Sequence, residues 1–111
     1  MQGHLIDLTD GTRLEVKVNF GTIYYLQKAR GYRRIAKKVE KKKELTESES
    51  LDMAANIIYA LLRSNGKKVE FEEALSLVPP DAEQIEKVLS AFQEEYEKYS
   101  KKKQAEKMPA R

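Results

Sequence analysis

The sequence has no cysteine, a single histidine, His4, and no glycine-rich phosphate loop. The absence of cysteine excludes disulfides and thiolate metal sites, and it suits a reducing cytosol. The longest apolar run, residues 57–62, is far shorter than the ~18 residues that a membrane-spanning helix needs, and no segment has the pattern of a signal peptide. No nucleophile, acid/base pair or cluster of metal ligands can be assembled. We therefore expect a cytoplasmic protein that is not an enzyme and that has no metal and no cofactor.

Charged residues are abundant instead, and they occur in blocks of opposite sign. They make up 35% of the 111 residues, although the net charge is only +3. Residues 28–43 contain nine Lys or Arg and one acid, whereas residues 70–97 contain nine Asp or Glu and one base. A uniformly basic surface would favour nucleic acid as the partner. Blocks of both signs are more typical of a protein that binds other proteins.

The N-terminal part of the chain predicts a β-hairpin. Two runs of alternating apolar and polar residues, 4–9 and 12–18, flank Asp10-Gly11, a pair that favours a two-residue type I′ turn. The apolar residues of the second run share one face. Because an isolated hairpin is marginal in water, we expect this face to rest on a helix or on further strands. Its residues are Leu14, Val16 and Val18.

Two helices and a loop are predicted after the hairpin. Asn19 is a suitable N-cap for the first helix, and Gly31 suits a left-handed residue that ends it. The second helix, over residues 33–43, has few apolar residues and is otherwise basic, which indicates a solvated or partner-facing helix. Residues 44–50 are polar and rich in N-cap types, and we expect a loop there.

The most apolar segment, residues 51–64, predicts a helix at the centre of the core. Its apolar residues have the spacing of one buried helical face. Asn65-Gly66 is expected to end this helix. The residues of the buried face are Leu51, Ala54, Ala55, Ile58, Leu61 and Leu62.

A short helix over residues 69–78, stopped by Pro79-Pro80, and a last helix from Asp81 complete the domain. The Lys-rich residues 101–111 are expected to form a flexible C-terminal tail. The sequence thus predicts a mainly α (α+β) fold, with an N-terminal β-hairpin and about four to five helices in one small domain, residues 1–100. The last helix carries an apolar stripe of Ile85, Val88, Leu89, Phe92, Tyr96 and Tyr99.

Six candidate partner-binding residues lie in the basic segment and at the end of the last stripe. The basic side chains can face a phosphate backbone, an acidic protein, or the chain's own Glu-rich helices. The tyrosines lie where the last helix is expected to leave the core, so they either pack on the hairpin or contact a partner. The six residues are Arg33, Arg34, Lys37, Lys38, Tyr96 and Tyr99.

Other polar residues are interpreted as surface groups. Alternation along the first strand places Asp7 on the face opposite His4, so a metal site shared by these residues and Asp10 is disfavoured. Glu72-Glu73 and Glu94-Glu95 are neighbours on helices, where adjacent side chains point about 100° apart. Such pairs do not converge on one substrate atom, and we expect no acid/base role for them.

Several segments of the chain occur in a distinctive order. A hairpin leads through residues 14–21 into a helix with Leu26-Gln27-Lys28, and an acidic, polar linker precedes residues 56–62. Residues 71–75 and a final helix with Ile85 and Phe92 follow. In this order the chain resembles the tail assembly chaperones encoded by long-tailed phages and prophages of Gram-positive bacteria. The resemblance covers nearly the whole chain, roughly Leu5 to Tyr99.

The resemblance implies a small, mostly helical cytosolic protein that is needed for tail building and is absent from the finished virion. Such chaperones coat the tape measure protein and recruit tail tube subunits until the tube has polymerised. They are often made in two forms, of which the longer arises by a ribosomal frameshift. The adjacent residues Lys101, Lys102 and Lys103 are compatible with an A-rich slippery run in the gene, although the residues alone favour a solvated lysine tail.

Two other functions remain alternatives. One is a small nucleic-acid-binding or regulatory protein that uses residues 28–43, and the other is a head–tail connector component retained in the particle. Self-association is also left open, because the basic and acidic blocks can pair between copies as well as within one molecule.

Overall fold

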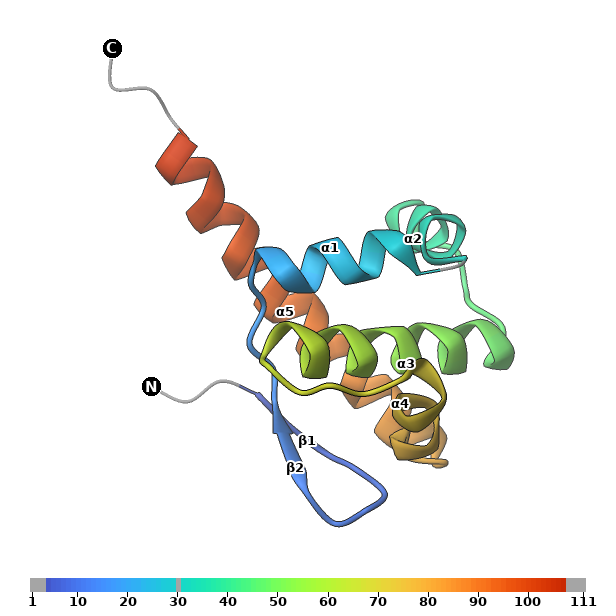
Figure 1. The fold of residues 1–111 in the computed structure, drawn as a ribbon. Coiled ribbons are helices and arrows are strands. Elements are labelled where there is room, and N and C mark those ends of the chain that lie inside the picture. The colour runs from blue at the N-terminus through green and yellow to red at the C-terminus, as the bar shows by residue number, and fades with distance from the viewer. Residues whose placement is uncertain (1–3, 30, 108–111) are drawn as a thin grey trace.

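The computed structural model describes residues 4–29 and 31–107, with side chains for residues 4–29, 31–39 and 41–101. Its elements pack as one mostly helical domain behind an N-terminal hairpin (Figure 1). This architecture confirms the predicted fold class. The elements are β1 (Leu5–Asp7), β2 (Arg13–Glu15), α1 (Phe20–Lys28), α2 (Tyr32–Glu40), α3 (Glu47–Ser64), α4 (Phe71–Leu77) and α5 (Ala82–Lys107).

The hairpin forms as predicted, but its turn is longer. Strands β1 and β2 are antiparallel, and Leu8 N–H donates to the Thr12 carbonyl at 2.9 Å. Three residues therefore connect this pair, and among them Gly11 alone has a positive φ, of 87°. The predicted two-residue type I′ turn is wrong, since it would need a positive φ at Asp10 as well. Instead the Asp10 carboxylate accepts hydrogen bonds from the Thr12 N–H and hydroxyl, at 3.0 and 2.6 Å, and so stabilises the longer loop.

Helix α1 begins at a capping box. The Asn19 side chain accepts a hydrogen bond from Thr22 N–H, and the Thr22 hydroxyl accepts one from Asn19 N–H, at 3.1 and 3.0 Å. This confirms Asn19 as the N-cap. Gly31 is left-handed as predicted, with a φ of 81°, but it serves as the N-cap of α2. It does not end α1, because Ala29 already leaves the helix in an extended conformation.

Helix α3 begins earlier than the sequence pattern indicates. Thr46 and Glu49 form a second capping box within the segment predicted as a loop, with distances of 3.1 and 2.9 Å. The loop prediction for residues 44–50 is therefore wrong from Glu47 onwards. Leu51, expected in the buried face, is 38% exposed because it lies in the first turns of this longer helix.

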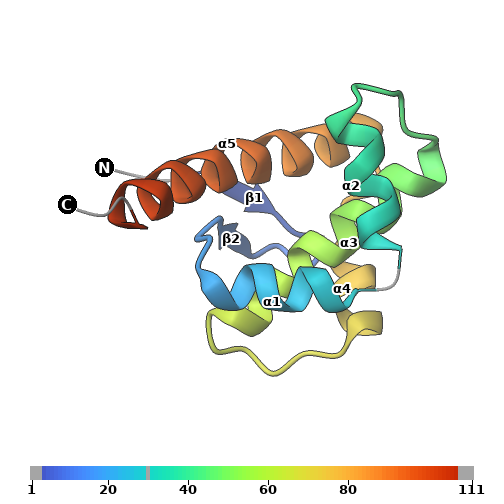
Figure 2. The same ribbon diagram turned by 90° about the horizontal axis from the view of Figure 1, so that it is seen from above.

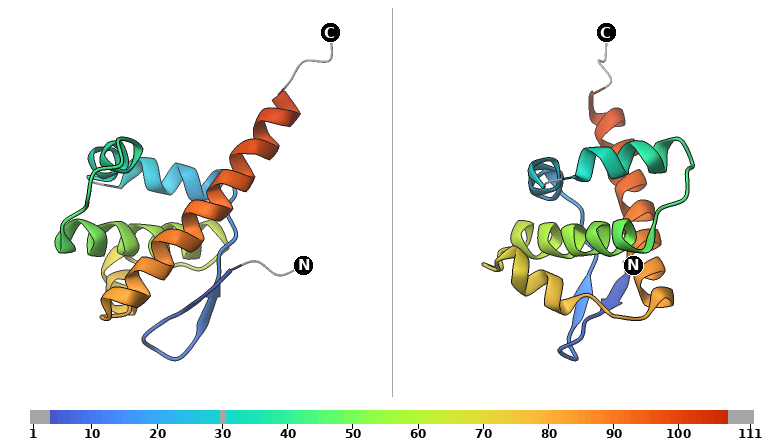
Figure 3. Two further views of the ribbon diagram at one scale, coloured as in Figure 1. Left: turned by 180° about the vertical axis from the view of Figure 1, so that it is seen from behind. Right: turned by 90° about the vertical axis from the view of Figure 1, so that its right-hand side faces the viewer.

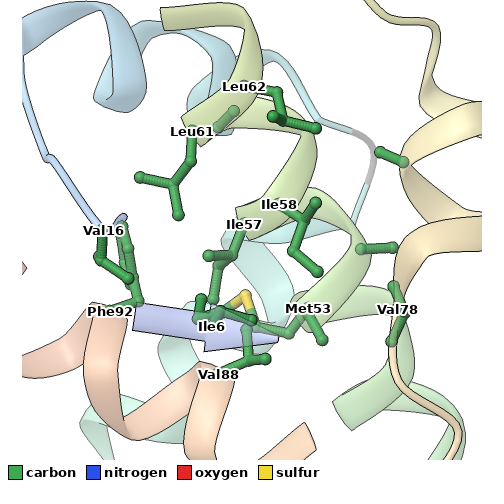
Figure 4. Packing of buried hydrophobic residues seen from close by; sticks show 14 of the residues in the cluster. Ile6, Val16, Met53, Ile57, Ile58, Leu61, Leu62, Val78, Val88 and Phe92 are labelled. Carbon is green, nitrogen blue, oxygen red and sulfur yellow. The ribbon is translucent and has the colours of Figure 1, made fainter. Parts of the chain in front are cut away.

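Helix α3 forms the centre of the core, as predicted. It packs against α1, α2, α4 and α5, and most of its residues from Met53 to Leu62 are buried. Figure 4 shows its Ile57 and Leu61 among side chains from α5 and the hairpin. Val16, directly after β2, is buried, and Leu14 and Val18 are half-buried, so the apolar face of the hairpin segment rests on this core.

Helix α5 crosses α3, contacts β1, and then extends beyond the rest of the domain (Figures 1 and 3). It continues past Tyr99 to Lys107, so the helix enters the Lys-rich segment. Residues 108–111 of the predicted flexible tail lie outside the described residues. Within the described part of the chain, no helix is both long enough and apolar enough to cross a membrane.

Candidate functional site

A groove lies between α2 and α5. Both helices pack on α3, but within the described residues no Cα atom of one lies within 8 Å of a Cα atom of the other. The right-hand view of Figure 3 shows α2 above α3, with α5 passing behind both, and Figure 2 shows the same arrangement from above. The groove is open and has a volume of about 940 Å³.

The inner lining of this α2–α5 groove is apolar. Helix α3 contributes Met53 and Ile57, and α5 contributes Phe92, all of them buried in the core. Leu89 is half-buried, and Val39 on α2 is 40% exposed. The groove therefore combines core side chains at its base with an accessible apolar wall, which is the composition expected of a binding groove for an apolar segment.

The two edges of the groove carry different charges. Arg33 and Lys37, four residues apart on α2, are exposed on one edge. Among the described side chains neither forms an ion pair. Glu94 on α5 lies on the other edge, together with the neutral residues Ser90 and Gln93. One edge is therefore basic, and the other is polar with a single acid.

Two half-buried tyrosines also line the groove. Tyr96 stacks on Phe92, with ring centroids 5.8 Å apart and an angle of 24° between the ring planes. Burial raises the pKa of the Tyr32 phenol above its ordinary value, and the nearby Tyr96 raises it further. The Tyr32 phenol is thus neutral at physiological pH and presents a hydrogen-bonding group beside the apolar lining.

The groove brings together three of the six residues predicted to bind a partner, namely Arg33, Lys37 and Tyr96. Lys38 is directed elsewhere, because its ammonium group pairs with the Glu49 carboxylate at 2.8 and 3.0 Å. Arg34 is exposed on α2, and Tyr99 is half-buried further along α5; neither lines the groove.

His4 joins the N-terminal strand to α5. Its Nε2 lies 2.8 Å from a Glu94 oxygen and 3.7 Å from a Glu95 oxygen, while Asp7 pairs with Arg13 at 3.1 Å. The sequence indicated a surface histidine, and the side chain is partly exposed, but its acidic partners are far away in the chain. Within the described residues, no group of three or more His, Asp or Glu is placed to hold a metal ion.

A second surface feature was not predicted. We call it the aromatic row, and in it edge-to-face contacts connect four rings, with centroid separations of 5.4, 6.0 and 6.0 Å. Two cations lie over these rings, at 4.8 to 5.7 Å from the centroids. The rings come from three different helices, α1, α3 and α4, so sequence periodicity contains no signal of the row. The rings belong to Tyr24, Tyr25, Tyr59 and Phe71, and the cations to Lys28 and Arg63.

Comparison with known proteins adds no assignment. No match to this chain is found among models of protein families, curated proteins or solved structures. The function is therefore inferred from the sequence pattern and from the geometry of the α2–α5 groove.

Proposed function

We propose that the protein is a phage tail assembly chaperone that binds the tape measure protein and recruits tail tube subunits during tail morphogenesis. The α2–α5 groove is the observation that best supports this proposal. It is an open apolar groove bounded by helices, and it contains three residues singled out from the sequence as partner-binding. Its occupant on this proposal is a helical segment of the tape measure protein that would otherwise expose apolar side chains to water.

The composition of the groove suits temporary binding. Apolar contacts provide affinity in proportion to the surface removed from water. The charges of Arg33 and Lys37 are exposed, so their contribution to binding is sensitive to salt and directs association more than it adds affinity. A chaperone needs this combination, because it must release the tape measure protein when the tail tube polymerises.

The proposal is tested by co-expressing the protein with the tape measure and tail tube proteins of the same genome, followed by size-exclusion chromatography. We expect co-elution with a soluble tape measure protein. Val39→Glu should weaken this association by about tenfold or more, because it places a carboxylate in the apolar wall of the groove. Leu75→Glu on α4 is the matched control, since Leu75 is 39% exposed and Val39 40% exposed.

Two results would contradict the proposal. In one, the chain elutes alone while the tape measure protein aggregates. In the other, Val39→Glu and Leu75→Glu weaken the association equally, which would assign the binding to a surface other than the groove.

The exposed basic residues of α2 favour nucleic-acid binding as a second candidate function. Arg33, Arg34 and Lys37 are exposed, and Lys41 to Lys43 extend the basic surface beyond the helix. If this function holds, duplex binding should fall steeply with added salt and should be abolished by the double variant Arg33→Glu/Arg34→Glu. Absence of duplex binding even at low salt would exclude it.

A further inference from the structure

We infer that the α2–α5 groove selects an amphipathic helix with acidic residues along the edge that faces α2 and neutral or basic residues along the edge that faces α5. The inference deepens the proposed function, since it names the class of segment that the same groove binds. It depends on the size of the groove and on the unequal charge of its two edges.

The size of the groove fits a short helical segment. An α-helix with its side chains is about 10 Å across, so 940 Å³ corresponds to roughly 12 Å of helix, or about two turns. Helices that pack directly have axes 8–10 Å apart, whereas α2 and α5 both pack on α3 and, in the described residues, no pair of their Cα atoms lies within 8 Å. A third helix laid between them would place apolar residues at positions i, i+3 or i+4, and i+7 against the accessible apolar lining, which is formed by Val39, Leu89 and Tyr96.

The charge of the edges determines which helix binds best. Arg33 and Lys37 occupy positions i and i+4 of α2, so both point along the same edge. An Asp or Glu pair with the same spacing on the bound helix can meet both cations. Glu94 on the opposite edge disfavours acids there, and it disfavours a nucleic acid, whose phosphates would approach both edges.

The inference is tested with three synthetic helices about 18 residues long, each built on a helix-favouring background. All three carry the same apolar stripe. They differ only along the edge that would face α2, which is acidic in one peptide, basic in the second and neutral in the third. Fluorescence anisotropy with the full chain measures their affinities. We expect the acidic-edge peptide to bind about tenfold tighter than the neutral one, with the basic-edge peptide weakest, and we expect high salt to reduce these differences.

Two double variants show whether the groove is responsible. Arg33→Glu/Lys37→Glu should reverse the order of the acidic-edge and basic-edge peptides. Arg34→Glu/Lys41→Glu changes the net charge equally at exposed positions outside the groove lining and should preserve the order. Circular dichroism establishes that both variants remain folded.

The inference is overturned if the three peptides bind with equal affinity or if none of them binds. It is also overturned if both double variants lose the preference for the acidic-edge peptide, or if a DNA duplex displaces that peptide. These results are distinct from failure of the proposed function. A preference for the acidic-edge peptide without co-elution of the tape measure protein would retain the groove and reject that partner.

Discussion

At the scale of single residues, Glu49 links the end of α2 to the start of α3. Its carboxylate accepts hydrogen bonds from the Lys38 ammonium at 2.8 and 3.0 Å, and from the Thr46 N–H at 2.9 Å. Lys38, followed by Thr46, holds the pKa of the Glu49 carboxyl below its ordinary value. One residue of the basic segment is therefore neutralised within the chain, by an acid that lies outside the acidic block at 70–97.

We expect the contacts of Glu49 to stabilise the fold at neutral pH and to be lost in acid. Because its folded pKa is lowered, the stabilisation is complete above the ordinary glutamate pKa of 4.5 and disappears as the pH falls through the lower folded value. Urea unfolding of the wild type and Glu49→Gln should therefore show a difference at neutral pH that vanishes in acid. Glu47→Gln, an equal charge change at an exposed neighbouring position, is the control and should have little effect. If Glu49→Gln lowers the free energy of unfolding by the same amount at every pH, the stabilisation does not come from the ionised Glu49 carboxylate.

At the scale of elements, α3 contributes more buried core residues than any other element, but not along its whole length. Leu61 is 0% exposed in the middle of the domain, whereas Leu51 in the first turns of the same helix is 38% exposed. Because both leucines lie in the same helix, the same substitution changes helix propensity equally at the two positions. A difference between the two variants therefore measures the effect of burial.

We expect Leu61→Ala to lower the free energy of unfolding by about 2–5 kcal/mol, because it removes buried methyl groups and leaves a cavity. Leu51→Ala should lower the free energy of unfolding by less than about 1 kcal/mol, since the Leu51 side chain is partly exposed and its removal loses little buried apolar surface. Urea titration with a shared slope measures both values. Similar losses for the two variants would mean that Leu51 is covered in solution, for example by contact with another copy.

The boundaries of the helices and of the hairpin turn show which local sequence signals predict where an element begins or ends. An apolar helical pattern follows Asn19 directly and so marks it as a cap. No such pattern follows Thr46 directly, because the polar residues 47–50 separate it from the apolar pattern that marks α3. The capping box of Thr46 and Glu49 is nevertheless a local sequence signal, and the S/T-x-x-E rule alone would have placed the start of α3 correctly. The prediction of a two-residue turn fails for another reason, since Asp-Gly also suits a three-residue loop in which only Gly11 is left-handed.

At the scale of the whole molecule, the two charge blocks are not paired with each other in the part of the chain that the structure describes. Among the described side chains, no ion pair joins residues 28–43 to residues 70–97. Both blocks are therefore accessible to partners of opposite charge, and a second copy of the chain is one of these.

We expect weak self-association at low salt that disappears at high salt, because exposed charges attract over about one Debye length, ~10 Å at moderate ionic strength. Sedimentation velocity at both salt concentrations measures it against the monomer mass of 12.8 kDa. The double variant Arg33→Glu/Arg34→Glu should remove the association. A monomer at every salt concentration would show that the blocks serve other partners only.

Local sequence determined the hairpin, the order of the helices, the cap of α1 and the central position of α3. These features depend on interactions within about four residues or on a regular apolar period, both of which are read directly from the chain. The basic character of α2 also follows directly from its residue types. It identified Arg33 and Lys37 as candidates, although it could not say what would lie opposite them.

Only the tertiary structure decided which surfaces these elements form. The α2–α5 groove exists because both helices pack on α3 while their described backbones stay apart, with no pair of Cα atoms within 8 Å, and no local pattern encodes such a separation. The contact of His4 with Glu94 and the edge-to-face contact of Tyr25 with Tyr59 likewise join residues far apart in the chain. Their formation depends on how the helices cross, and that is set by the packing of the whole core and not by the preferences of any one segment.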